Sequence, residues 1–336
     1  TAREKGLIKD GDEWVTEEEF HKRRGEILVD GKWIKLGEEA GKAYHKEAVG
    51  ATRLKLVYTW SPHFDVFSEV PPKITKRVAD ACEAAYVEMR RVLKPEGDEY
   101  PENEIERIKL TLFKKAPAYV RFSKWFNERE KCEELVPGWL RSVQRQHSFW
   151  WTHPEKMVSV YQFPNTDKTF VSNVVHNVGL VLITRYNINF LYPSVWLQEG
   201  FAYYLEMKTA GYTMSFTLGK GGSGGGEKGP VWAESDKWKG ALKKLVSEGQ
   251  DPPLKRIARM THDQFSYVEL VKSWSVVDFL IQWDRTKFKT FIDLSKARDS
   301  SGIAAIEEDA LKEAYGVGYR QLDTKWRAFV QNGFKP

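Results

Sequence analysis

Two apolar segments of the sequence each carry a residue that can bind a metal ion or exchange a proton. His176 lies within the run Val174–Leu180, and Glu199 lies within the run Val195–Glu206. An imidazole nitrogen and a carboxylate oxygen are ordinary zinc ligands, and the same two groups can also form a buried ion pair. A lone histidine on an apolar helix is more often a satisfied core residue than a ligand, so the neighbouring positions and the spacing decide between these chemistries.

The order and spacing of the two segments resemble those of gluzincin zinc metallopeptidases of the aminopeptidase type. In that family one helix carries the motif HExxH, in which two histidines bind zinc and the glutamate is the general base. A third ligand, also a glutamate, comes from the next helix in a segment like WLxEGxAxY. Here residues 196–204 read WLQEGFAYY, and eighteen residues separate Leu180 from Glu199. The resemblance, which covers about residues 51–332, implies that His176 and Glu199 occupy the first and third ligand positions.

The resemblance also implies what this chain has lost. Asn177 stands at the position of the base, and Leu180 stands at the position of the second histidine. An asparagine amide has no basic site of useful pKa, and a leucine side chain has no lone pair for a metal. Since catalytic zinc normally takes three protein ligands and a water, we expect no catalytic residue and no bound metal. His176, Asn177, Leu180 and Glu199 are then vestigial positions of an inactive peptidase homologue, a pseudopeptidase with a binding, scaffolding or assembly role.

In this hypothesis the former metal site becomes part of the core. Leu180 would fill the metal space, and His176 would hydrogen-bond Glu199 or Asn177, because a buried carboxylate without a metal needs a partner. A protonated imidazole can be that partner. The pair would then show a raised pKa for His176 and a lowered pKa for Glu199.

Two alternatives remain open from the sequence. An active zinc peptidase with rebuilt ligands would have to recruit another histidine, and His147 and His153 are the plausible recruits because they flank the strand before the first motif helix. A peptide-binding or glycan-binding protein would use aromatic side chains around the former cleft, although aromatic residues more often pack a core. The aromatic residues near the motif are Trp150, Trp151, Tyr161, Trp196, Tyr203 and Tyr204.

The resemblance adds one further aromatic residue. In active gluzincins a tyrosine that steadies the oxyanion often lies on a later helix, and Tyr267 is the tyrosine near that position here. The residues predicted to line the cleft are therefore Trp196, Tyr203, Tyr204 and Tyr267.

The elements that position these residues follow from the periodicity of the apolar side chains. The sequence predicts an α+β fold, with a strand-rich lobe at 49–165 and a helical lobe at 166–336. The resemblance implies that these two lobes form one gluzincin-like domain over 49–336. The predicted strands cover 52–60, 63–69, 105–113 and 148–163. The predicted helices cover 74–92, 118–135, 167–186, 194–208, 232–247, 261–283, 287–295, 303–315 and 319–329. The glycine-rich stretch 219–229 predicts a loop and not a phosphate-binding site, because no Gly-Lys-Ser/Thr opens a helix after a strand.

The first fifty residues contain a repeat. Residues 6–15 and 25–34 each place an Asp-Gly pair between apolar stretches and a tryptophan, Trp14 or Trp33, after it. Asp-Gly favours the tight turn of a β-hairpin, so we expect a small module over 1–48 with two hairpins, each joined to a short helix. The module could mediate interactions, but a role in packing is favoured because exposed tryptophans are costly.

Composition narrows the class of partner. The net charge is +5, and acidic and basic residues alternate, which is typical of an ordinary soluble surface and not of a nucleic-acid-binding face. No stretch is apolar and long enough to span a membrane. We expect a protein or peptide partner, and the resemblance favours an extracytoplasmic or secreted location. Cys82 and Cys132 could form one bridge in an exported protein or remain two buried thiols.

Overall fold

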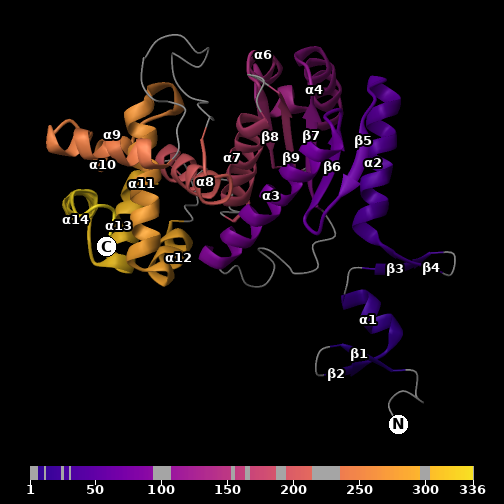
Figure 1. The fold of residues 1–336 in the computed structure, drawn as a ribbon, viewed down its shortest axis with the longest axis horizontal. Helices are drawn as coiled ribbons and strands as arrows, with labels where there is room; N and C mark the ends of the chain where they lie inside the picture. Colours follow the sequence, from indigo (N-terminus) through magenta and orange to yellow (C-terminus); the bar gives the residue numbers. More distant parts are fainter. Residues whose placement is uncertain are drawn as a thin grey trace.

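The computed structural model shows an α+β fold in which a five-stranded sheet lies between helices (Figure 1), as the sequence predicts. The structure describes the following residues: 7–10, 13–23, 26–29, 32–93, 107–152, 156–162, 167–186, 194–213, 235–295 and 303–335. The glycine-rich stretch 219–229 and His153 lie outside them.

The N-terminal repeat forms two antiparallel hairpins, each followed by a helix, and this confirms the predicted order of elements. The elements are β1 (Ile8–Asp10), β2 (Glu13–Val15), α1 (Glu17–Arg23), β3 (Glu26–Val29), β4 (Lys32–Lys35) and α2 (Leu36–Thr52). Helix α2 is long and runs across the predicted boundary between residues 48 and 49. Its Tyr44 and Ala48 are buried against the sheet. Trp14, in contrast, is 43% exposed, so its side chain is only partly covered.

The central sheet has the strand order β5-β6-β7-β9-β8. Its strands are β5 (Val57–Trp60), β6 (Phe64–Ser68), β7 (Ile108–Phe113), β8 (Ser148–Trp151) and β9 (Met157–Tyr161). Strands β6, β7 and β9 are parallel, and the two edge strands β5 and β8 are antiparallel to their neighbours. The stretch 148–163, predicted as one strand, is therefore two paired strands.

Alternate residues of the parallel strands enter two separate hydrophobic cores, because successive side chains of a strand point to opposite faces. Leu110 and Leu112 of β7 face the first core, and Phe113 faces the second. Helices α3 (Pro72–Leu93) and α7 (Asp167–Tyr186) contribute to the first core. The second core contains residues of α2 and of three further helices, namely α4 (Ala116–Glu130), α5 (Cys132–Leu135) and α6 (Trp139–Gln144).

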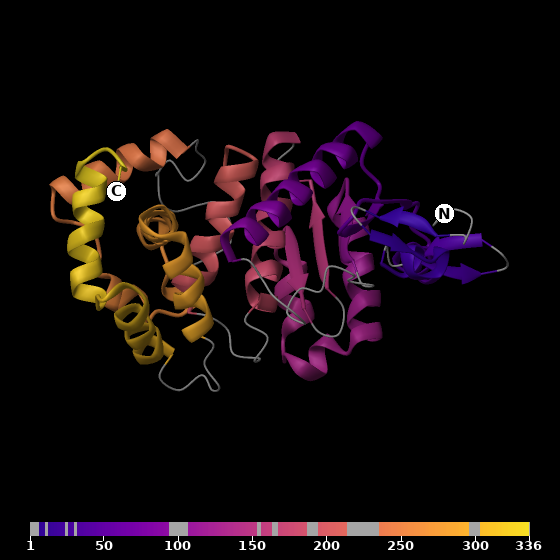
Figure 2. The ribbon, with the colours of Figure 1, turned by 90° about the horizontal axis from the view of Figure 1, so that it is seen from below.

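The first core continues into a helical lobe that lies beyond α7, away from the N-terminal hairpins (Figure 2). Its elements are α8 (Val195–Thr209), α9 (Ser235–Ser247), α10 (Leu254–Ile257), η3 (His262–Gln264), α11 (Tyr267–Trp283), α12 (Arg285–Leu294), α13 (Ile303–Tyr315) and α14 (Tyr319–Gln331). The predicted helix 261–283 is interrupted, because Ser266 caps α11 and the backbone at Phe265 is extended.

Helix α8 packs between α7 and α11 at two glycines. A Cβ atom on Gly179 of α7 would lie 2.8 Å from the Cα of Ala202, and one on Gly200 of α8 would lie 2.6 Å from the carbonyl oxygen of Ser273. The glycine of the EGxA segment therefore permits the close approach of α8 to α11. These two contacts fix the position of Glu199, which lies next to Gly200.

Both cysteines are free and buried. Cys82 lies in the first core and Cys132 in the second, so the reading as two separate thiols is confirmed and the bridge is not formed. In the part of the chain that the structure describes, no helix is long and apolar enough to cross a membrane.

Candidate functional site

Helices α7 and α8 bring His176 and Glu199 together, and this confirms the predicted pairing. The Nε2 atom of His176 lies 3.2 Å from the Oε2 atom of Glu199, and the two side chains are 0% and 2% exposed. The two atoms are not aligned for a hydrogen bond, and neither has another hydrogen-bond partner among the described residues. Their contact is therefore an attraction between charges, shielded from solvent.

A second carboxylate lies at the other nitrogen of the same ring. The Nδ1 atom of His176 lies 3.2 Å from the Oε2 atom of Glu206, which is also fully buried. The hydroxyl of Ser172 contacts the other oxygen of Glu206 and lies 2.7 Å from the carbonyl oxygen of Tyr212. The role of Glu206 was not predicted. Its position seven residues after Glu199, two turns along the same face of α8, is the signal that could have indicated it.

The two carboxylates hold the imidazole in its protonated form. Burial alone would lower the pKa of His176, but Glu199 and Glu206 outweigh burial and raise that pKa to about 9. Burial likewise opposes ionisation of Glu199, but His176 and His262 outweigh it and lower the pKa of Glu199 to about 2. Both shifts have the predicted direction. Contact with Glu199 therefore favours the charged form of both partners, His176 and Glu199.

A different histidine from those predicted lies beside Glu199. The Nε2 atom of His262, on η3, is 3.7 Å from the Oε1 atom of Glu199, and its side chain is 51% exposed. His147 instead places its Nδ1 atom 2.8 Å from the hydroxyl of Tyr161. No periodic pattern links His262 to the motif helices, so this neighbour could be found only from the fold.

Asn177, at the position of the base, is tied to its own helix and to the sheet. Its amide nitrogen lies 2.8 Å from the carbonyl oxygen of Asn173 and 3.3 Å from the hydroxyl of Ser148 on β8. His176 therefore pairs with Glu199 and not with Asn177. Leu180, one turn from His176 on α7, is buried as expected.

His176 and Glu199 supply two of the three protein ligands that catalytic zinc normally takes. The separation of 3.2 Å between His176 and Glu199 is close to the distance of about 3.4 Å between two ligands of one tetrahedral zinc, so the pair alone would suit a metal. Leu180, at the position of the second histidine, offers no donor atom. Among the described residues, no group of three or more His, Cys, Asp or Glu side chains could hold a metal ion. That no metal binds stays a prediction.

Two of the four predicted cleft residues belong near the site. The ring of Tyr203 lies 4.3 Å from that of His176, and burial, with Glu199 and Glu206, raises the pKa of Tyr203. Trp238 links this ring to Tyr267, with centroids 5.2 and 6.2 Å apart in turn. The buried hydroxyl of Tyr267 has no hydrogen-bond partner among the described residues, and burial raises its pKa to about 12.

The other two predicted cleft residues lie elsewhere. Trp196 is fully buried, and its Nε1 atom donates to Glu307 of α13 over 2.9 Å. The hydroxyl of Tyr204 donates over 2.5 Å to Glu88 of α3. Positions 199, 203 and 206 share the face of α8 that meets His176, whereas these two aromatic residues point to other neighbours. Trp196 and Tyr204 therefore do not face His176, and their assignment to a cleft stays a prediction.

Comparison with protein-family models gives no match for this chain, and a search among curated proteins gives none. The likeness to gluzincins therefore rests on the motif residues of α7 and α8, their order and their spacing.

Proposed function

We propose that this protein is a gluzincin-like pseudopeptidase, which keeps the two motif helices but does not hydrolyse peptides, and that it acts by binding a protein or peptide. The observation that supports this proposal is the closed charge cluster in which both ring nitrogens of His176 face buried carboxylates, Glu199 and Glu206. A histidine in this state has no lone pair to offer a metal.

Binding of zinc to this site would first require the loss of a proton. Since the pKa of His176 is raised to about 9, its deprotonation at pH 7 would cost about 3 kcal/mol before a metal could bind. Peptide hydrolysis also needs a base for the attacking water, and the amide of Asn177 cannot accept a proton at neutral pH. The charge state of His176 therefore disfavours metal binding, and Asn177 leaves the position of the base without a group that can accept a proton.

Zinc content of the purified protein tests the proposal. After treatment with a chelator and dialysis, the native chain should take up no stoichiometric zinc. The double variant Asn177→Glu with Leu180→His restores the family's base and second ligand on α7, and it should bind zinc. A matched variant with Asn177→Glu alone should not. Stoichiometric zinc in the native chain, together with peptide hydrolysis, would overturn the proposal.

The alternative, an active zinc peptidase with rebuilt ligands, has one observation in its favour. His262 lies near Glu199 and could approach a metal there. If the native chain did take up zinc, the variant His262→Ala should abolish that uptake under this alternative. An unchanged zinc content in that variant would exclude it. An extracytoplasmic location stays a prediction of the resemblance.

A further inference from the structure

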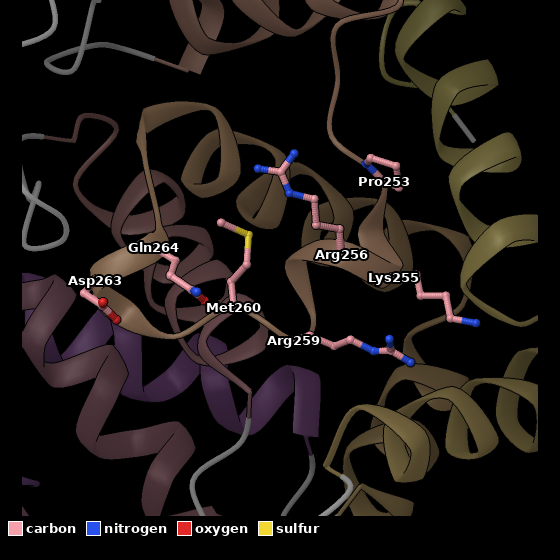
Figure 3. A pocket seen from close by; sticks show the side chains of 7 residues that line it. All are labelled: Pro253, Lys255, Arg256, Arg259, Met260, Asp263 and Gln264. Atoms are coloured by element: carbon pink, nitrogen blue, oxygen red, sulfur yellow. The ribbon is translucent and has the colours of Figure 1, made fainter.

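An open pocket of about 990 Å³ lies on the short segment that leads into the candidate site (Figure 3). The residues that line it are Pro253, Lys255, Arg256, Arg259, Met260, Asp263 and Gln264. We refer to it as the basic pocket. All seven come from one stretch of chain, which includes α10 and ends on η3.

The three cationic side chains of the basic pocket are exposed and unpaired. Among the described residues, Lys255, Arg256 and Arg259 make no side-chain hydrogen bond and no ion pair. The single carboxylate of the lining, Asp263, accepts a hydrogen bond from Thr261. Three cations against one carboxylate leave an excess of two positive charges in the pocket, which would attract an anionic ligand.

Buried charges fix the backbone from which these cations project. The ammonium group of Lys272 on α11 contacts Asp251, Asp323 and the carbonyl oxygen of Pro252, at 2.7 to 2.8 Å. Asp323 also accepts a hydrogen bond of 2.9 Å from the backbone nitrogen of Leu254. The start of the segment is therefore held to α11 and α14, so a ligand would not have to order it on binding.

The other end of the segment reaches the charge cluster of the candidate site. Thr261 and Gln264 cap η3, where the backbone nitrogen of Thr261 donates to the Gln264 side chain over 2.9 Å. The same turn carries His262, which lies 3.7 Å from Glu199. A ligand in the basic pocket would therefore lie next to the histidine that faces the former metal position.

We infer that the basic pocket binds an acidic segment of a peptide or protein partner. In Figure 3 the side chains of Lys255 and Arg259 extend to one side of the segment and that of Arg256 to another, which suits an elongated ligand with several carboxylates better than one small anion. A nucleic acid would need a longer basic face with many phosphate contacts. The inference names the partner class for the binding role proposed above and rests on that role.

A titration with a defined probe tests this inference. The probe is a short fluorescein-labelled peptide of alternating glutamate and alanine, and its binding to the full chain is followed by fluorescence anisotropy with a chelator present. The pocket variant combines Lys255→Gln, Arg256→Gln and Arg259→Gln, and affinity should fall about tenfold, since each exposed ion pair contributes a few tenths to one kcal/mol. The control variant, Lys46→Gln with Lys124→Gln and Arg145→Gln, removes the same charge from exposed cations on α2, on α4 and at the end of α6.

Each outcome decides for or against the inference. Weaker binding by the pocket variant, with native affinity in the control variant, would support it. An equal loss of affinity in both variants would mean that only the net charge of the protein attracts the peptide, and this would overturn the inference. So would tighter binding of an oligothymidylate of the same length, or equal binding of a peptide with glutamine in place of glutamate. The chelator removes metal from the peptide titration. A failure of the peptide to bind can therefore be told apart from a result of the zinc test that contradicts the proposed function.

Discussion

At the scale of single residues, the charge of the candidate site depends on whether His176 carries its second ring proton. His176 carries a carboxylate at each ring nitrogen, and none of these three side chains is open to solvent. A buried charge without a partner is strongly destabilising, whereas a cation between two anions is tolerated. The protonation of His176 therefore couples the stability of the α7–α8 pair to pH.

Stability should fall as the pH rises above neutrality. The pKa of His176 is raised from 6.5 to about 9 in the folded state, so its contribution is fully present below pH 6.5 and is lost as the pH rises through 9. The loss should amount to about 3 kcal/mol, measured as the free energy of urea unfolding across that interval. The variant His176→Gln should be less stable and should lack this dependence. A free energy that stays constant from pH 6.5 to 9 in the native chain would contradict the assignment.

The acidic limb has the opposite sign. The pKa of Glu199 is lowered from 4.5 to about 2, so its contribution is present above pH 4.5 and is lost as the pH falls towards 2. The two contributions reflect one interaction and are not additive. Stability from this cluster should therefore be greatest between pH 4.5 and 6.5.

Removal of the imidazole alone should be more harmful than removal of all three charges. His176→Ala leaves Glu199 and Glu206 buried together without a cation, and we expect a loss of about 3–5 kcal/mol in the free energy of unfolding. The triple variant that adds Glu199→Gln and Glu206→Gln keeps the same cavity but no charge. Chemical unfolding of both should show the triple variant to be the more stable. If it is equally or less stable, the cavity and not the charge explains the loss.

At the scale of helices and strands, the position of Glu199 depends on how closely α8 approaches its neighbours. A Cβ atom on Gly200 would lie 2.6 Å from a backbone oxygen of α11, which cannot rotate away as a side chain could. Gly200→Ala should therefore push α8 from α11 and lower the free energy of unfolding by about 1–3 kcal/mol. Gly240→Ala is the matched control, because Gly240 is an exposed helical glycine with open space around it.

The control should behave in the opposite way. Alanine has a higher helix propensity than glycine, so Gly240→Ala should raise the free energy of unfolding by up to about 1 kcal/mol. Urea unfolding of both variants measures the difference. Similar effects of the two substitutions would mean that the contact between α8 and α11 is not tight.

The bounds of some elements could be predicted from the sequence, and those of others could not. The bounds predicted for α7 and α13, 167–186 and 303–315, agree with the structure. The start of α11 was missed, although Ser266 and Glu269 form a capping box that the sequence shows. Residues 148–163 were read as one strand because their aromatic and β-branched side chains continue through both strands. The pairing of His176 with Glu199 followed from the spacing, whereas the approach of His262 depends on a turn that no periodicity predicts.

At the scale of the whole molecule, α2 connects the N-terminal hairpins to the central sheet, and its buried side chains pack in the second core beside that sheet. Tyr44 lies against Phe67 and Trp125, with ring centroids 5.3 and 5.5 Å away, and the guanidinium of Arg129 lies 4.9 Å above its ring. The predicted boundary after residue 48 passes through this helix. A division of the chain by its packing would fall before residue 36.

Two shortened chains distinguish these boundaries. A chain that begins at residue 36 keeps all of α2, and its free energy of unfolding should stay close to that of the full chain. A chain that begins at residue 49 loses Tyr44 and Ala48 from the second core, and it should be less stable by at least about 3–5 kcal/mol, the usual effect of removing one large buried aromatic side chain. Urea unfolding followed by tryptophan fluorescence measures both. Because the described residues of the first core, which includes α7 and α8, all follow residue 63, the charge cluster should keep its pH dependence in the chain that begins at residue 36. Equal stability of the two shortened chains would show that α2 belongs with the hairpins, and the boundary after residue 48 would then stand.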